Sequence, residues 1–264
     1  MKYLILFISF AVIANANDGV LMFKPFTASV FEPRIGSIIN TTDENLRLDI
    51  GASFDLYRFE INSDFKMSMG TDFFTFTRLR SEENFKFPVE TSDYFFGINS
   101  AAVFKAFNQN FTSRFRLAHI SSHLVDGYSK DGIFFSEPFV YSREFTDLSI
   151  ALNKKSGFID YRIYSGFMYI FSTTPDDVNN ITYYIGADFT KLLSKNIALV
   201  GGLDIRNGEV SRTNIAGQLG LNFKFFKDFG IFIGYYKYHG SSMHGMFYKD
   251  FDNYDGIGFQ IIYF

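Results

Sequence analysis

The chain has 264 residues, 20% of them aromatic, with no cysteine and a formal net charge of −3. The absence of cysteine excludes a disulfide framework, a cysteine-based metal site and a lipoprotein acyl anchor. The small net charge gives no indication of nucleic-acid binding. The mean hydropathy is near zero, which fits a soluble β protein and a transmembrane β-barrel equally well, because alternating barrel strands dilute their hydropathy.

The first residues read as a secretory signal peptide. Lys2 supplies a positive charge, residues 3–13 form an apolar stretch, and Ala14 and Ala16 make a small-x-small cleavage site. The apolar stretch is shorter than the roughly 20 residues that a membrane-spanning helix needs. We therefore expect residues 1–16 to be removed and residues 17–264 to form a single domain.

Period-two alternation of apolar and polar residues runs through the remaining chain. In residues 46–57 (LRLDIGASFDLY), apolar residues alternate with a set that includes Arg47 and Asp49. Such alternation predicts strands with one apolar and one polar face. Twelve such runs begin near Phe26, Leu46, Asp64, Tyr94, Phe111, Phe139, Phe158, Ile181, Ile197, Asn214, Gly230 and Asn253.

The connections between these runs alternate between short and long. The short turns fall near residues 60–63, 108–110, 153–157, 192–196 and 225–229, and the longer loops near 81–93, 123–138, 172–180 and 240–252. An even strand number with short periplasmic turns and longer extracellular loops is typical of bacterial outer-membrane barrels. We therefore predict an all-β fold, an antiparallel transmembrane β-barrel of about 12 strands. A soluble periplasmic β-sandwich is the alternative, and the apolar outward face of nearly every run disfavours it.

The polar faces of the runs carry charges of both signs. They include Arg47, Asp49, Asp55, Asp160, Arg162, Asp188, Asp204 and Arg206. If these faces point into the barrel, opposite charges would pair across a narrow interior. We therefore expect a filled lumen and not an open channel.

Every histidine of the chain lies beside a pair of serines. The two groups are His119, Ser121, Ser122 and His123, and His239, Ser241, Ser242 and His244. Both groups fall at the predicted extracellular ends of their strands. Strands five and eleven of a closed twelve-strand barrel are diametrically opposite. We therefore expect the two groups to lie at the same level along the barrel axis but on opposite sides of the barrel. They could meet through loops folding over the mouth, across a filled lumen, or between two copies of the protein.

Parity assigns the faces of the fifth run. Arg114 and Arg116 belong inside, because an arginine on the lipid face costs several kcal/mol near the midplane. His119 and Ser121 have the opposite parity, so we expect them to face lipid near the outer leaflet, whereas Ser122 faces the lumen. Residues two apart on a strand are about 6–7 Å apart at Cα, within reach of a side-chain hydrogen bond.

This pairing suggests nucleophilic chemistry, because a serine hydroxyl becomes a nucleophile when an imidazole takes its proton. We predict Ser121 as the nucleophile, His119 as the general base, and Glu137 as the group that orients the imidazole. Tyr141, Asp126 and Glu144 are alternatives. The choice is open because the apolar set of the sixth run changes parity, which suggests a bulge.

The same residues also allow interpretations without catalysis. Histidine and serine are amphipathic and suit the rim of a barrel with no chemistry. A metal ion between His119 and His123 would have to bridge about 13 Å along the strand, which one ion cannot do. Asp126 and Asp131 could hold Ca²⁺, but two acidic residues in a polar loop are usually just solvated.

Two stretches carry a resemblance to known families. "HISSHLVD" and "GSSMHGMF" resemble the marks of an uncharacterised family of bacterial outer-membrane proteins, H-x-S-S-H-L followed by an acidic residue and a late G-S-x-x-G-x-F-like stretch. The H-x-S of His119 and Ser121 also resembles the catalytic H-x-S of the outer-membrane phospholipase A and lipid A 3-O-deacylase barrels. Those enzymes have Asn after the Ser, where this chain has Ser122.

The resemblance to these enzymes implies a serine-type lipid esterase that acts on outer-membrane lipids at the outer leaflet. The alternative is a non-enzymatic barrel, either a narrow pore or a structural surface protein. The final stretch, ending in Phe264, resembles the signal by which the barrel-assembly machinery recognises its clients. The sequence leaves the oligomeric state and the identity of any solute open.

Overall fold

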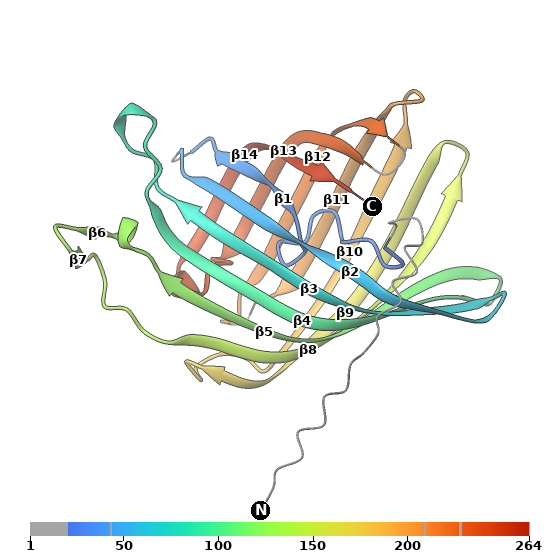
Figure 1. Ribbon diagram of the computed structural model, residues 1–264, viewed down its shortest axis with the longest axis horizontal. Coiled ribbons are helices and arrows are strands. Elements are labelled where there is room, and N and C mark those ends of the chain that lie inside the picture. The colour runs from blue at the N-terminus through green and yellow to red at the C-terminus, as the bar shows by residue number, and fades with distance from the viewer. Residues whose placement is uncertain (1–20, 43, 209, 227–228, 264) are drawn as a thin grey trace, which may run out of the picture.

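The computed structural model describes residues 21–42, 44–208, 210–226 and 229–263, and within them twelve antiparallel strands close into a barrel (Figure 1). The barrel strands are β1 (Ile35–Asn40), β2 (Leu46–Asn62), β3 (Phe65–Leu79), β4 (Val89–Ala106), β5 (Gln109–Leu124), β8 (Tyr141–Ser156), β9 (Ile159–Thr174), β10 (Ile181–Leu192), β11 (Ile197–Asn207), β12 (Thr213–Phe226), β13 (Phe229–Ser241) and β14 (Phe251–Ile262). Pairing of β1 with β14 closes the barrel. The predicted twelve-strand antiparallel barrel is confirmed.

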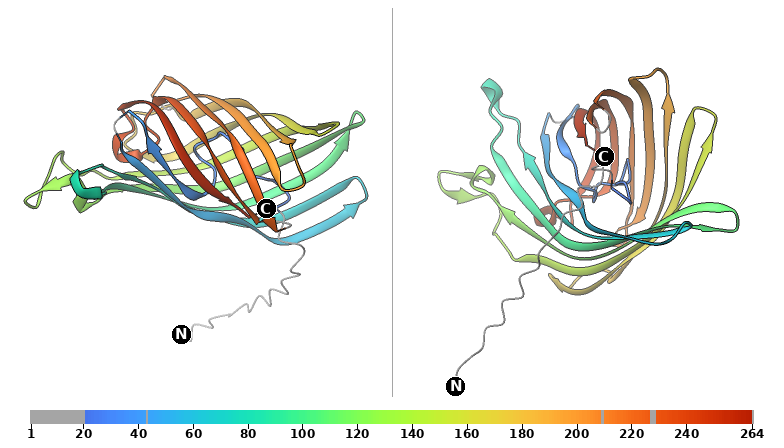
Figure 2. Two further views of the ribbon diagram at one scale, coloured as in Figure 1. Left: turned by 90° about the horizontal axis from the view of Figure 1, so that it is seen from above. Right: turned by 45° about the vertical axis from the view of Figure 1, so that its right-hand side comes forward.

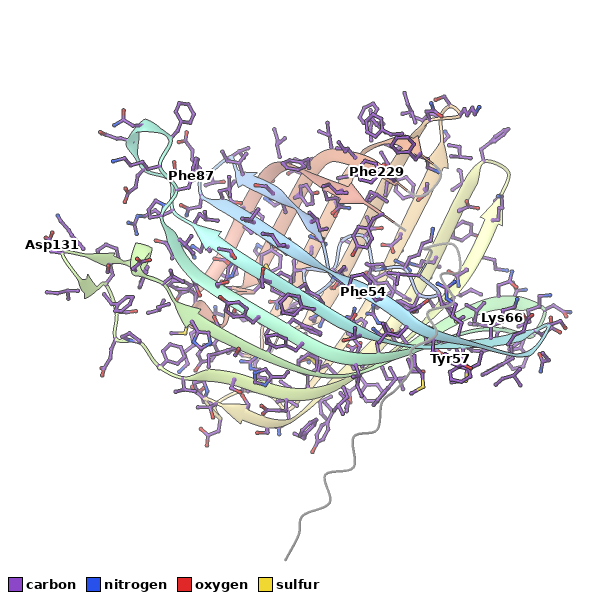
Figure 3. The ribbon with its side chains drawn as sticks, viewed as in Figure 1. Phe54, Tyr57, Lys66, Phe87, Asp131 and Phe229 are labelled. Carbon is purple, nitrogen blue, oxygen red and sulfur yellow. The ribbon has the colours of Figure 1, made fainter. Side chains whose placement is uncertain are left out.

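Short elements occupy the connections. A hairpin of β6 (Ser129–Lys130) and β7 (Ile133–Phe134) lies between β5 and β8, with Asp131 at its tip, and stands away from the barrel body (Figures 1 and 3). Three 3₁₀ turns, η1 (Glu83–Phe85), η2 (Asp126–Tyr128) and η3 (Gly245–Phe247), complete the assigned elements. The described part of the chain contains no helix of the length and apolarity that a membrane crossing requires.

The two ends of the barrel differ, and we call them the turn end and the loop end. At the turn end, short connections join β2 to β3, β4 to β5 and β8 to β9. At the loop end the longer connections are residues 80–88, 125–140, 175–180 and 242–250. Figure 2 shows the loops gathered at one end of the molecule. The predicted alternation of short turns and longer loops is therefore present.

Outward side chains form an apolar belt, as the alternation predicts. Phe54 and Tyr57 of β2 point away from the barrel (Figure 3) and are 52% and 54% exposed. On the opposite face of β2, Arg47, Asp49 and Ser53 are buried in the lumen. On β5, Arg114 and Arg116 are buried, whereas Phe115 and Leu117 are exposed. The parity argument for β5 therefore holds.

The first predicted run is corrected by the structure. Residues 21–34, which include Phe26, do not form a strand but fold into the lumen, and β1 begins only at Ile35. Pro25 and Pro33 lie within this segment, and proline cannot donate a ladder hydrogen bond. Burial inside the lumen stabilises Phe26 instead, because its ring stacks on that of Tyr164 with the ring centroids 3.6 Å apart.

Polar contacts also hold this luminal segment. Arg162 donates to the backbone carbonyl of Lys24 at 2.7 Å. Glu32, buried at 2% exposure, accepts hydrogen bonds from Arg114 and Arg116. A cavity of only about 20 Å³ remains beside Glu32, which has room for about one water. Charges pair across the interior, as the mixed signs of the polar faces indicated.

The structure also corrects the bulge expected in the sixth run. β8 pairs with β5 without any register shift, and its odd residues from Tyr141 to Ala151 are all buried. The extra residue is Phe171 on β9, between the pairs Glu144–Ser172 and Phe145–Ile170. The apparent parity change arises because Tyr141 and Phe145 belong to an apolar cluster inside the lumen.

We expect the loop end to face outward from the cell. Cysteine in place of Lys130, exposed on the β6–β7 hairpin, should react with an impermeant maleimide on intact cells. Cysteine in place of Phe158, 78% exposed at the turn end, should react only after the outer membrane is opened. The absence of native cysteine makes the labelling specific. Labelling of position 158 on intact cells would mean that the turn end, and not the loop end, faces outward.

Candidate functional site

The first candidate site lies on the outer wall of β5 and β8, near the loop end. His119 is directly opposite Glu144 across the two strands, and His119 Nδ1 lies 2.9 Å from Glu144 Oε1. Ser121, two residues further along β5, is opposite Ser142. The side chains of His119 and Glu144 are 39% and 36% exposed, so both are accessible from outside.

Glu144 is well supplied with hydrogen-bond donors for a carboxylate on an outer wall. Besides His119, it accepts a hydrogen bond from Ser142 Oγ at 3.3 Å and one from the hydroxyl of Ser172. The bulge at Phe171 brings Ser172 into register with Glu144. Such bulges re-aim side chains beside functional sites. The three donors stabilise the ionised carboxylate at this position.

The hydrogen bond defines what the imidazole can do. Glu144 favours the tautomer of His119 that carries its proton on Nδ1, because a carboxylate accepts and does not donate. Nε2 is then the ring atom free to take a proton. Ser121 shares the outward face of β5 with His119, so its hydroxyl is the proton source nearest along the strand. Serine, histidine and carboxylate in these roles are the components of acyl-transfer catalysis.

The outward site borders the apolar belt. The ring of Phe96 on β4 lies 6.3 Å from that of His119, and Phe96 is 43% exposed. Leu117, one step toward the turn end on the same face, is also exposed. On the other side, His123 is exposed and its ring lies 6.0 Å from that of Tyr94. The site thus lies where apolar outward side chains give way to polar ones.

Of the groups considered to orient the imidazole, the structure places Glu144 at His119. Glu137 is exposed in the segment that precedes β8, and Asp126 is exposed at the start of η2. Tyr141 points into the lumen with the odd residues of β8. The outward position of Glu144 could have been predicted from the sequence by continuing the alternation through β8 without a bulge.

His244 of the second histidine group belongs to a separate cluster inside the lumen. His244 Nδ1 lies 2.7 Å from Asp93 Oδ2, and the backbone N–H of Gly245 donates to Asp93 Oδ1 at 2.7 Å. Ser122 Oγ accepts from the backbone N–H of Met246 at 3.1 Å and lies 3.3 Å from Thr91 Oγ1. We call the contacts of residues 244–246 with β4 and β5 the loop latch.

The loop latch brings residues that follow the second serine pair into contact with Ser122 of the first. Residues 242–250 fold over the mouth of the barrel, which is one of the three arrangements that the sequence allowed, and bring His244 to β4. Ser122 is 1% exposed, and its hydroxyl accepts a hydrogen bond from the backbone N–H of Met246. Its role is therefore to hold the loop in place. Sequence reasoning missed Asp93, because only the folded loop makes it a neighbour of His244.

The other residues of the two groups have simpler surroundings. His239 Nδ1 lies 3.4 Å from Asn253 Oδ1, and the centre of its ring lies 4.9 Å from the ring centre of Phe251. Ser241 and Ser242 are buried beneath the loop. Within the described ranges, no three His, Asp or Glu side chains are grouped so that they could hold a metal ion. Phe264 and residues 1–16, for which a signal peptide was predicted, lie outside the described residues.

Comparison with solved structures shows the fold. Outer membrane phospholipase A from Escherichia coli is similar with a TM-score of 0.51 and 14% identity, over 94% of this chain and 96% of that chain. The CymD monoaromatic hydrocarbon channel has a TM-score of 0.45 and 8% identity, over 82% and 72%. LpxR from Salmonella typhimurium has a TM-score of 0.41 and 10% identity, over 83% and 88%. At these identities the likeness is one of fold, that of outer-membrane β-barrels.

Comparison with sequences adds the family. No curated protein sequence matches this chain. Residues 40–263 match the family described as "Protein of unknown function (DUF1207)". This range covers every barrel strand except β1, of which it includes only the last residue, Asn40. The chain therefore belongs to the DUF1207 family.

Proposed function

We propose that this protein is a serine-type lipid acyl hydrolase of the outer membrane. The observation that carries the proposal is the 2.9 Å hydrogen bond between His119 and Glu144 on the outer wall, beside Ser121 on the same face. Ser121 acts as the nucleophile, His119 as general base and then general acid, and Glu144 as the group that orients and stabilises the imidazole.

The reaction follows from these roles. Ser121 Oγ attacks the ester carbonyl carbon while its proton passes to His119 Nε2. The tetrahedral intermediate collapses as the protonated imidazole gives that proton to the leaving alcohol, which leaves the acyl group on Ser121. Water, deprotonated by the same imidazole, then attacks the acyl ester and releases a fatty acid. Glu144 stays ionised throughout and stabilises the imidazolium.

The position of the site supports a lipid as the substrate. An ester at the boundary between acyl chains and headgroups would lie level with the step from the apolar belt to His119 and Glu144. A soluble ester in the lumen would not reach Ser121, which faces outward. The stretch from His119 to Ser121 matches the H-x-S of the phospholipase and deacylase barrels, and supports the same assignment.

A narrow pore is the second candidate. A vestibule of about 660 Å³ opens at the turn end and is lined by Arg34, Lys224 and Gln260 among others. It would form the inner half of a solute path. Residues 21–34 lie inside the lumen and the loop latch closes over its mouth, however, so a path would require both to move. For this reason we favour the hydrolase.

Acyl release by the purified, refolded barrel tests the proposal. Wild-type protein in mixed micelles should release fatty acid from a phospholipid or from an acylated glycolipid, assayed with Ca²⁺ and with a chelator. Ser121→Ala should lower the rate by about 10³–10⁶-fold, because it removes the nucleophile. Ser122→Ala, the same change one residue further along β5 on the luminal face, is the matched control and should leave most of the turnover. Absence of acyl release from either substrate, together with ion conductance in a planar bilayer, would favour the pore.

A further inference from the structure

A second pocket lies on the luminal side of the barrel mouth, away from the outward site. It has a volume of about 490 Å³ and lies between the loop-end residues of β1, β2 and β3 and the residues that lead into β14. Its charged and titratable lining consists of Arg47, Arg78, His244, Asp250, Asp252 and Tyr254. None of these residues takes part in the proposed hydrolysis.

Arg47 and Arg78 are an unusual pair. They are directly opposite each other on β2 and β3, and both point into the lumen. Directly opposite residues have Cβ atoms about 4.5–5.5 Å apart, and like charges at such positions destabilise a sheet. Two cations facing one pocket in this way favour an anion between them.

Each guanidinium is fixed in place and still has donors to spare. Arg47 is paired with Asp49 at 2.7 Å and its guanidinium lies 5.3 Å from the ring centre of Phe76. The side chain is 6% exposed, yet its Nη1 has no hydrogen-bond partner among the described residues. A buried donor of this kind carries a desolvation cost unless a partner is supplied.

Arg78 is held in a similar way from the neighbouring strand. Its Nε lies 3.0 Å from Glu90 Oε2, and its guanidinium stacks 4.8 Å from the ring centre of Phe247 in the folded loop. Because the carboxylate contact uses Nε, the two Nη groups can donate to a ligand. Arginine presents such donors in a planar fork that matches carboxylate and phosphate oxygens.

His244 adds a third nitrogen to the same pocket. Its Nδ1 is engaged by Asp93, so Nε2 is the atom left for a ligand. Asp250 and Asp252 carry the opposite charge and line the pocket beside these nitrogens. They would accept hydrogen bonds from hydroxyl or amino groups and would repel a ligand that is anionic throughout.

We propose that this loop-end pocket binds a small organic anion, with its carboxylate or phosphate held by Arg47, Arg78 and His244 and its hydroxyl or amino groups held by Asp250 and Asp252. The ligand is water-soluble, because the pocket opens on the luminal side of the mouth while lipids contact the outer wall. This binding function does not depend on the proposed hydrolysis.

Calorimetric titration of the detergent-folded protein tests the site with four probes: glucose 6-phosphate, glucuronate, inorganic phosphate and glucose. The two sugar anions should bind more tightly than inorganic phosphate, and glucose should not bind. Arg78→Gln should weaken the binding of glucose 6-phosphate by about 10–100-fold, because a charged hydrogen-bonding partner is lost.

Arg80→Gln is the matched control and should bind like wild type. Arg80 contacts the same Glu90, and the two arginine side chains are 28% and 27% exposed, but Arg80 does not line the pocket. Glu90 keeps one arginine partner in either variant, which protects folding. A proton NMR spectrum adds a second readout, since only the His244 resonance among the four histidines should shift with ligand.

The proposal is overturned if neither sugar anion binds, if glucose binds as well as its phosphate, or if Arg78→Gln binds like wild type. Micelles that contain phosphatidic acid separate a lipid source from a soluble one. If these micelles shift the His244 resonance and the sugar anions do not, the pocket recognises a lipid headgroup, and the assignment to a soluble ligand is wrong.

Discussion

Glu144→Gln should lower the rate of lipid acyl release by about 10²–10⁴-fold while leaving the barrel folded. Glutamine has nearly the same shape, but it carries no charge to stabilise the imidazolium of His119. Its amide can also donate to Nδ1, which would favour the wrong tautomer for accepting the proton of Ser121. Acyl release and heat-modifiable migration in SDS, measured on the same preparation, separate catalysis from folding.

Glu137→Gln makes the same chemical change in the exposed segment before β8 and should leave the rate within about twofold of wild type. The double variant Ser121→Ala with Glu144→Gln should be no slower than Ser121→Ala alone, because the three groups act as a unit. Additive losses would mean that Glu144 contributes to stability and not to the proton transfer. A large loss in Glu137→Gln with normal turnover in Glu144→Gln would assign the orienting role to Glu137.

The outward placement of His119 and Ser121 followed from the sequence because it rests on local parity. The arginines seven and five residues before Ser121 cannot face lipid, so alternation carries the assignment along β5. The carboxylate on β8 could not be fixed in the same way. The sixth run was interpreted on the rule that apolar side chains face lipid, and near the loop end this rule reverses.

The reversal has a structural cause. The lumen near the loop end is closed by an apolar cluster to which Tyr141, Phe145 and Met246 contribute. Apolar residues on β8 therefore point inward there, while Ser142 and Glu144 point outward. A rule based on strand pattern alone cannot detect a lumen that is filled by distant parts of the chain.

The luminal segment shows the same limit. Its alternation near Phe26 resembles that of a strand, yet the segment has no partner strand, because β14 already pairs with β1 from Ile35 onward. Its residues find partners 138 and 161 positions away: the Phe26 ring stacks on Tyr164, and the backbone N–H of Thr27 donates to Asp188. Contacts at such separations depend on closure of the barrel, so they are not readable from local spacing.

The charge cluster at Glu32 should be the largest single contributor to the attachment of this segment. Glu32 Oε2 lies 2.9 Å from Arg114 Nη1 and 3.1 Å from Arg116 Nη2, and all three side chains are at most 5% exposed. Glu32→Ala would leave two buried guanidinium groups with Asp72 as the carboxylate bound to Arg116. Removing one partner of a buried ion pair typically costs about 3–5 kcal/mol.

We therefore expect Glu32→Ala to lower the free energy of unfolding by about 3–5 kcal/mol in a guanidinium titration in detergent. Glu60→Ala is the control and should change it by at most about 1 kcal/mol, because Glu60 pairs with Lys66 at an exposed position. The loosened segment should also let water and ions into the lumen, so Glu32→Ala should conduct in a planar bilayer where wild-type protein does not. If both proteins are equally stable and equally non-conducting, residues 21–34 are held by their aromatic contacts alone, and the charge cluster does not close the barrel.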